Sequence, residues 1–205
     1  MQLPVTSVSA DQAKHEITVE CGGTFVITES DFLALDIAQT ACADPEKLAF
    51  CADKLACIKK SENYLSYGDL SERKLREKLK GKFEPRVIDA VVDMFTKKGY
   101  IDDATLAERY ANELARTRLW GAKRIAQYLY TKGFKREDIS AACDSLDAES
   151  MRCNLRELIE KTAPKADLST PKAVSAYGAK LYRLGWDWDE IKPALAEYSK
   201  EQSWP

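Results

Sequence analysis

The 205-residue sequence predicts a mainly α-helical protein in which a small N-terminal β-hairpin region precedes three tandem three-helix repeats. Three observations predict this class. Apolar and polar residues alternate within about the first 30 residues, apolar residues recur at helical spacing from about residue 44, and four apolar positions return roughly every 51 residues. We therefore expect a β-rich region at 1–43 and repeats at 44–100, 101–147 and 148–205.

The β-hairpin is expected near residues 16–28. Apolar side chains alternate over 17–21 and again over 25–27, and Gly22 and Gly23 separate the two runs. Two adjacent glycines suit a tight turn because both adopt positive φ without strain. Residues 5–8 are a candidate third strand.

Helix starts are predicted where a capping residue or a proline precedes an apolar run. Asp44 followed by Pro45 is such a pair, and Asp187 with Glu190 matches a capping box. We expect Asp103 to be an N-cap whose carboxylate accepts backbone N–H bonds, rather than a metal ligand or a catalytic acid. The other predicted starts are Ser71, Pro85, Gly121 and Thr170–Pro171.

The repeat register is marked by Phe83, Phe134 and Trp186, which lie 51 and 52 residues apart. Each has an isoleucine five residues later, a leucine four or five residues earlier, and another apolar residue four before that leucine. Such recurrence predicts stacked units that bury one another's apolar faces. The remaining registered residues are Leu75, Leu79, Ile88, Ile125, Leu129, Ile139, Tyr177, Leu181 and Ile191.

Composition excludes several classes of protein. No apolar run is long enough for a membrane span, and the N-terminus lacks the features of a signal peptide, so we expect a cytoplasmic protein. The six cysteines form no CxxC pair and His15 is the only histidine, which disfavours a zinc site and histidine-based catalysis. Phosphate-binding and dinucleotide-binding glycine motifs are absent from the sequence. We expect no enzyme activity, no cofactor and no metal.

Charge is unevenly distributed along the chain. Residues 1–53 hold 2 basic and 9 acidic side chains, residues 54–136 hold 20 and 11, and residues 137–205 hold 9 and 13. A basic middle segment indicates binding to a polyanion or to an acidic partner. The alternative is that these helix surfaces are simply solvated.

Basic residues crowd the second helix of the first repeat and the corresponding helix of the second. Superposed repeats would place them in one stripe suited to a phosphate backbone or an acidic protein surface. The alternative is a solvated face with pairs such as Arg73 and Glu77. Trp120, Tyr128 and Tyr130 either stack on bases or lie half-buried at repeat junctions. The binding candidates are Arg73, Lys74, Arg76, Lys78, Lys80, Lys82, Arg116, Lys123, Arg124, Lys132, Lys135 and Arg136.

Residues 99–139 resemble the central repeat of the RecX family, whose members regulate the recombinase RecA. Segments 64–83 and 181–195 resemble the first and third repeats of that family, so the resemblance covers roughly 50–200. The residues that carry the central match are Gly99, Tyr100, Ile101, Asp102, Asp103, Leu106, Ala107, Tyr110, Gly121, Arg124, Ile125, Leu129, Lys132, Gly133, Phe134 and Ile139.

The resemblance implies a non-enzymatic regulator in DNA repair, recombination and the SOS response. Such a protein binds the RecA–DNA filament and restrains its ATPase, extension and strand exchange; we expect a monomer. The alternative is a nucleic-acid-binding repeat module that needs no recombinase. Two departures affect the first repeat: Gly68 and Leu70 stand where the family usually has arginines, and Lys82–Phe83 lacks the glycine that precedes Phe134 and Trp186.

Overall fold

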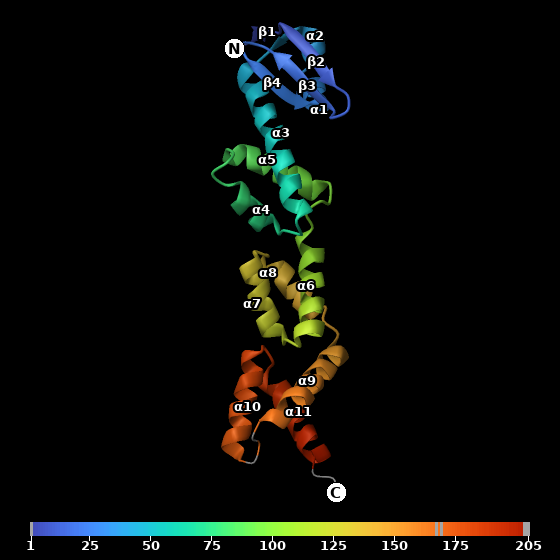
Figure 1. Ribbon diagram of the computed structural model, residues 1–205, viewed down its shortest axis with the longest axis vertical. Helices are drawn as coiled ribbons and strands as arrows, with labels where there is room; N and C mark the ends of the chain where they lie inside the picture. Colours follow the sequence, from blue (N-terminus) through green and yellow to red (C-terminus); the bar gives the residue numbers. More distant parts are fainter. Residues whose placement is uncertain (1, 167, 169, 203–205) are drawn as a thin grey trace. The chain divides into compact units, whose positions relative to one another are not determined.

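The computed structural model describes residues 2–166, 168 and 170–202 (Figure 1). Contacts group the chain into unit 1, residues 1–101, and unit 2, residues 102–205. Unit 1 contains β1 (Leu3–Pro4), β2 (Ser7–Asp11), β3 (Glu16–Glu20), β4 (Thr24–Thr28), α1 (Glu29–Ala34), α2 (Ile37–Thr40), β5 (Cys42–Ala43), α3 (Pro45–Ser66), α4 (Glu72–Leu79) and α5 (Pro85–Lys97). Unit 2 contains α6 (Asp103–Arg118), α7 (Ala122–Lys132), α8 (Arg136–Asp144), α9 (Ala148–Thr162), the 3₁₀ turn η1 (Ala163–Lys165), α10 (Pro171–Arg183) and α11 (Trp188–Gln202).

The predicted hairpin is confirmed as the antiparallel pair β3–β4, in which Ile17 lies opposite Ile27. Gly22 has φ +66° in its turn, as predicted, whereas Gly23 does not adopt the positive φ that was expected of both glycines. The third strand is β2, which pairs with β3 but begins at Ser7, two residues later than predicted. The amide of Val5 instead donates to the carbonyl of Ala41 at 3.0 Å, beside a second small sheet formed by β1 and β5.

Helices α1 and α2 were not expected in the β-rich region. Helix α1 begins after Thr28, whose hydroxyl oxygen accepts the backbone N–H of Asp31 at 3.1 Å. The Asp31 carboxylate is buried and pairs with the ammonium of Lys54 on α3. These helices have six and four residues, too short for an apolar period to appear in the sequence. Their contacts tie the β region to α3.

Helix α3 belongs to two cores within unit 1. It begins as predicted, with Asp44 as N-cap and Pro45 in the first turn. Leu48 and Cys51 pack with the strands, whereas Cys57 packs with α4 and α5. A single helix of 22 residues therefore carries both the β region and the first three-helix repeat.

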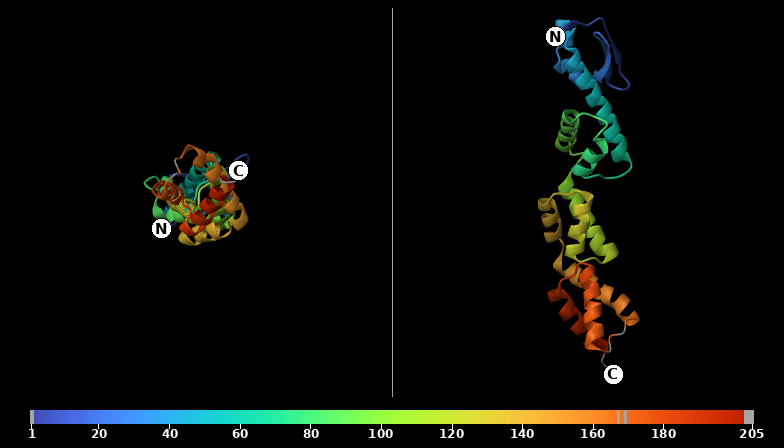
Figure 2. Two further views of the ribbon diagram at one scale, coloured as in Figure 1. Left: turned by 90° about the horizontal axis from the view of Figure 1, so that it is seen from below. Right: turned by 90° about the vertical axis from the view of Figure 1, so that its left-hand side faces the viewer.

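The registered apolar residues form the cores of the repeats, as predicted, with one exception. All of them are buried except Phe83, which is half-buried and therefore only flanks the core of unit 1. In unit 2, α6, α7 and α8 pack on one another, and α9 and α10 both contact α11 (Figure 2). No helix in the described ranges combines the length and apolarity that a membrane span would need.

The turn after the second helix differs between repeats, which explains the position of Phe83. Gly133 and Gly185 have φ +98° and +96° and directly precede the buried Phe134 and Trp186. In the first repeat the positive-φ glycine is Gly81, φ +79°, which lies two residues before Phe83. Helix α4 accordingly ends at Leu79 after only eight residues.

Predicted caps are mostly found, with one correction. Ser71 and Thr170 cap α4 and α10 through their hydroxyl oxygens. The N-cap of α6 is Asp102, not Asp103: its carboxylate accepts the Thr105 N–H at 3.0 Å and the Thr105 hydroxyl at 2.7 Å. The Thr105 hydrogen bonds, from the backbone first, lower the pKa of Asp102 below its usual value.

Candidate polyanion-binding surfaces

The first turns of α4 carry cations that are largely neutralised by neighbouring carboxylates. Glu77 pairs with Lys74 at 2.8 Å and with Arg73 at 3.6 Å, so the i,i+4 pair predicted for Arg73 is present. Leu70 stands where the RecX family usually has an arginine, and it packs against the core of unit 1. Arg73 and Lys74 therefore match the solvated, paired face that the sequence left as an alternative.

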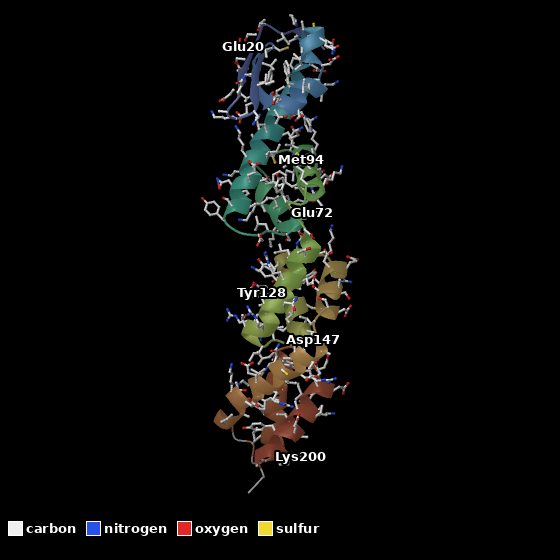
Figure 3. The ribbon with its side chains drawn as sticks, turned by 90° about the vertical axis from the view of Figure 1, so that its right-hand side faces the viewer. Glu20, Glu72, Met94, Tyr128, Asp147 and Lys200 are labelled. Carbon is white, nitrogen blue, oxygen red and sulfur yellow. The ribbon has the colours of Figure 1, made fainter. Side chains whose placement is uncertain are left out.

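Arg76 ties α4 to α5. Its guanidinium contacts Glu72 at 2.9 Å, and Glu72, labelled in Figure 3, begins α4. It also contacts two carboxylates of α5, Asp89 and, at 3.6 Å, Asp93. Because carboxylates of unit 1 neutralise its charge, Arg76 mainly stabilises the packing of α4 against α5.

Three lysines of unit 1 surround Tyr64, on α3. The ammonium nitrogens of Lys60, Lys78 and Lys82 lie 5.3, 5.1 and 5.0 Å from the Tyr64 ring centroid, and Lys82 also donates to the Tyr64 hydroxyl. Among the described residues, none of the three lysines has a carboxylate partner. We call these four residues the tyrosine–lysine cluster.

The tyrosine–lysine cluster concentrates three positive charges around one ring, and an anion would neutralise them. Each ammonium lies about 5 Å from one ring centre, so any two are within about 11 Å of each other. That separation is close to the Debye length of about 8 Å at physiological salt, and mutual repulsion is only partly screened. The Lys82 hydrogen bond, with the charges of all three lysines, lowers the pKa of Tyr64 below its ordinary value. A polyanion would relieve this repulsion.

Sequence reasoning named Lys78 and Lys82 but missed Lys60. Lys60 and Tyr64 are four residues apart on α3, a spacing that places them on one helix face. That spacing was the available signal. The cluster is completed by the packing of α4 against α3, which the sequence does not reveal.

In unit 2 the cations of α7 lie against aromatic rings. The guanidinium of Arg124 lies 4.4 Å from the Trp120 ring centroid. The ammonium of Lys132 lies 5.2 Å from the ring centroid of Tyr128, which Figure 3 labels on α7. The two rings meet edge to face at 5.8 Å. Trp120 and Tyr128 are half-buried against the core of unit 2, whereas Tyr130 is 56% exposed.

The N-terminus of α7 is joined to the turn between α10 and α11. The amide of Gly121 donates to the Leu184 carbonyl at 2.9 Å, and the indole N–H of Trp186 donates to the Leu119 carbonyl at 3.1 Å. A Cβ atom on Gly121 would lie 2.3 Å from the backbone of Gly185. Only glycine permits this approach, which brings the start of α7 against the turn between α10 and α11.

Lys123 and Arg124 reinforce that junction. The ammonium of Lys123 pairs with Asp187 and lies 5.3 Å from the ring centroid of Tyr182. The Asp187 hydrogen bond raises the pKa of Lys123 above its ordinary value. Arg124 donates to the Arg183 carbonyl at 3.2 Å. Both cations therefore stabilise contact between repeats and keep further N–H donors for a ligand.

The remaining candidates lie at exposed positions on their own elements. Lys80 is the C-cap of α4, Arg116 lies in the last turn of α6, and Lys135 is the N-cap of α8, just before Arg136. The single stripe predicted across the first two repeats would join residues of both units and stays a prediction. In the described part of the chain, no three His, Cys, Asp or Glu side chains converge as metal ligands.

These features define a class: a tandem three-helix-repeat protein whose second helices carry cations beside aromatic rings. A family model described as the first three-helix domain of RecX matches residues 57–94, and one described as its second three-helix domain matches 102–142. These matches support the RecX family for this chain, as its sequence indicates.

Individual relatives agree with this assignment. The chain is 32% identical to the regulatory protein RecX of Clostridioides difficile over 137 residues, which are 66% of this chain and 65% of that protein. It is 26% identical to that of Clostridium tetani over 129 residues, 61% of this chain and 59% of the relative. The matches thus span less than two thirds of these relatives' own lengths.

Two solved structures share the fold. A crystal structure of regulatory protein RecX superposes with a TM-score of 0.79 at 19% identity, covering 93% of this chain and 97% of that one. The crystal structure of RecX from Lactobacillus salivarius has a TM-score of 0.66 at 21% identity, covering 71% of this chain and 96% of that one. At these identities the likeness concerns the fold.

Proposed function

We propose that this chain binds the RecA–DNA filament and restrains its ATPase, extension and strand exchange. Similarity to regulatory proteins named RecX supports a regulatory role. The observation that carries the proposal is the tyrosine–lysine cluster, whose three ammonium groups lack carboxylate partners among the described residues. Such a cluster suits the acidic or phosphate-bearing surface of a nucleoprotein filament.

The mechanism we propose is steric and electrostatic. Tandem repeats present similar helices at regular intervals, which suits a filament whose protomers also repeat. By binding adjacent protomers the chain would favour one arrangement of them and slow ATP turnover and protomer addition. A ligand shifts such an equilibrium only by its differential affinity for the two states.

The test is a titration of RecA ATPase on single-stranded DNA with this chain. We expect the rate to fall as the chain is added. Replacing Lys60, Lys78 and Lys82 together with alanine should raise the half-inhibitory concentration roughly tenfold or more, since each lost ion contact is worth about 0.5–1 kcal/mol.

The matched control removes the same charge elsewhere in unit 1, by Lys47→Ala, Lys97→Ala and Lys98→Ala at exposed positions. The control should inhibit like the unaltered chain. An ATPase rate that does not respond to the chain would contradict the proposed function. An equal loss of inhibition in both triple variants would show that the tyrosine–lysine cluster does not carry the binding.

The alternative, a nucleic-acid-binding module without a recombinase, is favoured by the cation–aromatic contacts of α7. The dependence of binding affinity on salt concentration distinguishes the two functions. Binding to naked single strands should weaken by about 0.7 log units in affinity per log unit of salt for each phosphate neutralised. We expect binding to RecA-coated DNA to persist at salt that abolishes binding to naked DNA. Equal affinity for both, with the same steep slope, would favour the alternative.

A further inference from the structure

A row of cations and aromatic rings crosses the junction of the second and third repeats. At one end, the ammonium of Lys132 lies over the ring of Tyr128, which meets the Trp120 ring edge to face. The guanidinium of Arg124 lies over the Trp120 ring. On the other side of the junction, Lys123 lies over Tyr182, and Tyr182 stacks on Trp188. All seven residues belong to unit 2, so their arrangement is defined within one body.

The exposed end of this row is the pair formed by Tyr182 and Trp188. Their ring centroids are 6.1 Å apart and their planes meet at 18°, a stacked arrangement. Tyr182 is 43% exposed and Trp188 is 37% exposed. Neither ring belongs to the buried core of unit 2, which contains the nearby Trp186.

Local packing holds the pair in place. Gly178 on α10 lets the Trp188 ring approach the helix, since a Cβ there would lie 2.7 Å from a ring atom. Lys123, anchored by Asp187, closes over Tyr182 at 5.3 Å from its centroid. The pair is therefore a preorganised aromatic surface, which loses little conformational entropy when a flat group binds.

Charges around the pair nearly balance. Lys123, Arg124, Lys180 and Arg183 are the nearby cations on α7 and α10, and Asp187, Asp189 and Glu190 are the acidic residues at and just before the start of α11. Long-range attraction of phosphates is therefore weak at this site. Binding here has to come from ring contact, which every nucleobase offers through its π face.

We propose that Tyr182 and Trp188 form a stacking platform for an unpaired base of single-stranded nucleic acid, with Lys123 and Arg124 donating to the adjacent backbone. Bases within a duplex are already stacked and paired, so the platform selects single strands. This deepens the proposed function by naming the nucleic acid, but it rests on contacts of unit 2 and needs no recombinase for its test.

The experiment compares two strands of equal charge. Fluorescence anisotropy would measure the affinity of the chain for a labelled oligothymidylate and for an abasic oligomer of the same length. Stacking of one base is worth about 1–3 kcal/mol, so we expect at least about fivefold tighter binding to the strand that carries bases. The double variant Tyr182→Leu with Trp188→Leu should lose this preference and keep its affinity for the abasic strand.

Two further variants keep the result interpretable. Trp188→Phe retains a ring and should retain most of the preference, which a purely structural role of the indole would not predict. Tyr67→Leu with Tyr100→Leu removes two rings that are 86% and 65% exposed in unit 1, and should leave the preference unaltered.

Equal affinity of the unaltered chain for both strands would overturn the platform. A double variant that folds and still prefers the base-carrying strand would do the same. A chain that restrains RecA ATPase but shows no base preference would refute the platform alone and leave the proposed function intact.

Discussion

Helices α4 and α7 are the second helices of successive repeats, yet their cations contact different partners. On α4, Arg76 contacts carboxylates of its own repeat, while Lys78 joins the tyrosine–lysine cluster. On α7, Lys123 and Arg124 contact the third repeat through Asp187 and the Arg183 carbonyl. The second helices of successive repeats thus carry like charges with different partners, and the neighbouring element decides which partner each cation contacts.

The glycines that follow the second helices of the first and third repeats also differ in what they contact. Gly185, after α10, meets the start of α7 so closely that a Cβ would lie 2.4 Å from the Arg124 amide nitrogen. Gly81, after α4, has nothing within 4 Å of where its Cβ would be. Gly185 therefore permits the close contact between the third and second repeats, whereas Gly81 only allows the backbone to turn.

The largest expected effect tests this contrast through Gly185→Ala and Gly81→Ala. Both residues have positive φ, so both changes introduce backbone strain of about 1–2 kcal/mol. Gly185→Ala adds overlap with backbone atoms and should lower the free energy of unfolding by roughly 3 kcal/mol or more in total. Urea denaturation of the two variants would measure this. Equal losses would contradict the close contact between the second and third repeats.

A smaller effect separates two neighbouring cations of α4. Arg76→Ala should lower the free energy of unfolding by about 1 kcal/mol, because it leaves the carboxylates of α4 and α5 facing one another. Lys78→Ala should cause no loss, because it relieves repulsion among the lysines around Tyr64. Thermal unfolding of both single variants would check the order. The distinction fails when Lys78→Ala is as destabilising as Arg76→Ala.

The smallest effect is a change in the titration of Tyr64. In a chain with ¹³C-labelled tyrosine, NMR should show the pKa of Tyr64 below its ordinary value. Lys82→Ala should raise it most, since the Lys82 hydrogen bond is the largest contribution, and Lys60→Ala and Lys78→Ala should raise it less. Lys98→Ala is the control. A Tyr64 pKa that Lys82→Ala does not alter would contradict the cluster geometry.

The lowered pKa also fixes the sign of a pH effect. Between the folded and unfolded pKa values the native chain binds fewer protons than the unfolded chain, so stability rises with pH in that alkaline window. The contribution is complete above the unfolded value and is lost as pH falls through the folded value. It is therefore absent at neutral pH.

Local signals explain which elements the sequence could predict. Helix starts at Asp44, Ser71 and Thr170 follow from side chains that accept a backbone N–H only two or three residues away. The displacement of one N-cap to Asp102 shows the limit, because two adjacent aspartates offer the same chemistry and the backbone conformation chooses between them. Helices α1 and α2 were missed because they are too short to show a period.

The sequence by itself determined the three-helix repeats and their buried faces, because the period of the apolar residues is a property of a single helix and its register recurs in each copy. It also determined that the cations would concentrate on α4 and α7. Only the tertiary structure decided that Arg76 faces α5, that Lys60 completes a cluster with Lys78 and Lys82, and that Tyr182 and Trp188 stack beside Lys123. In each case the partners come from separate segments of the chain. Electrostatic and stacking energies depend on a separation in space that no spacing along the chain specifies.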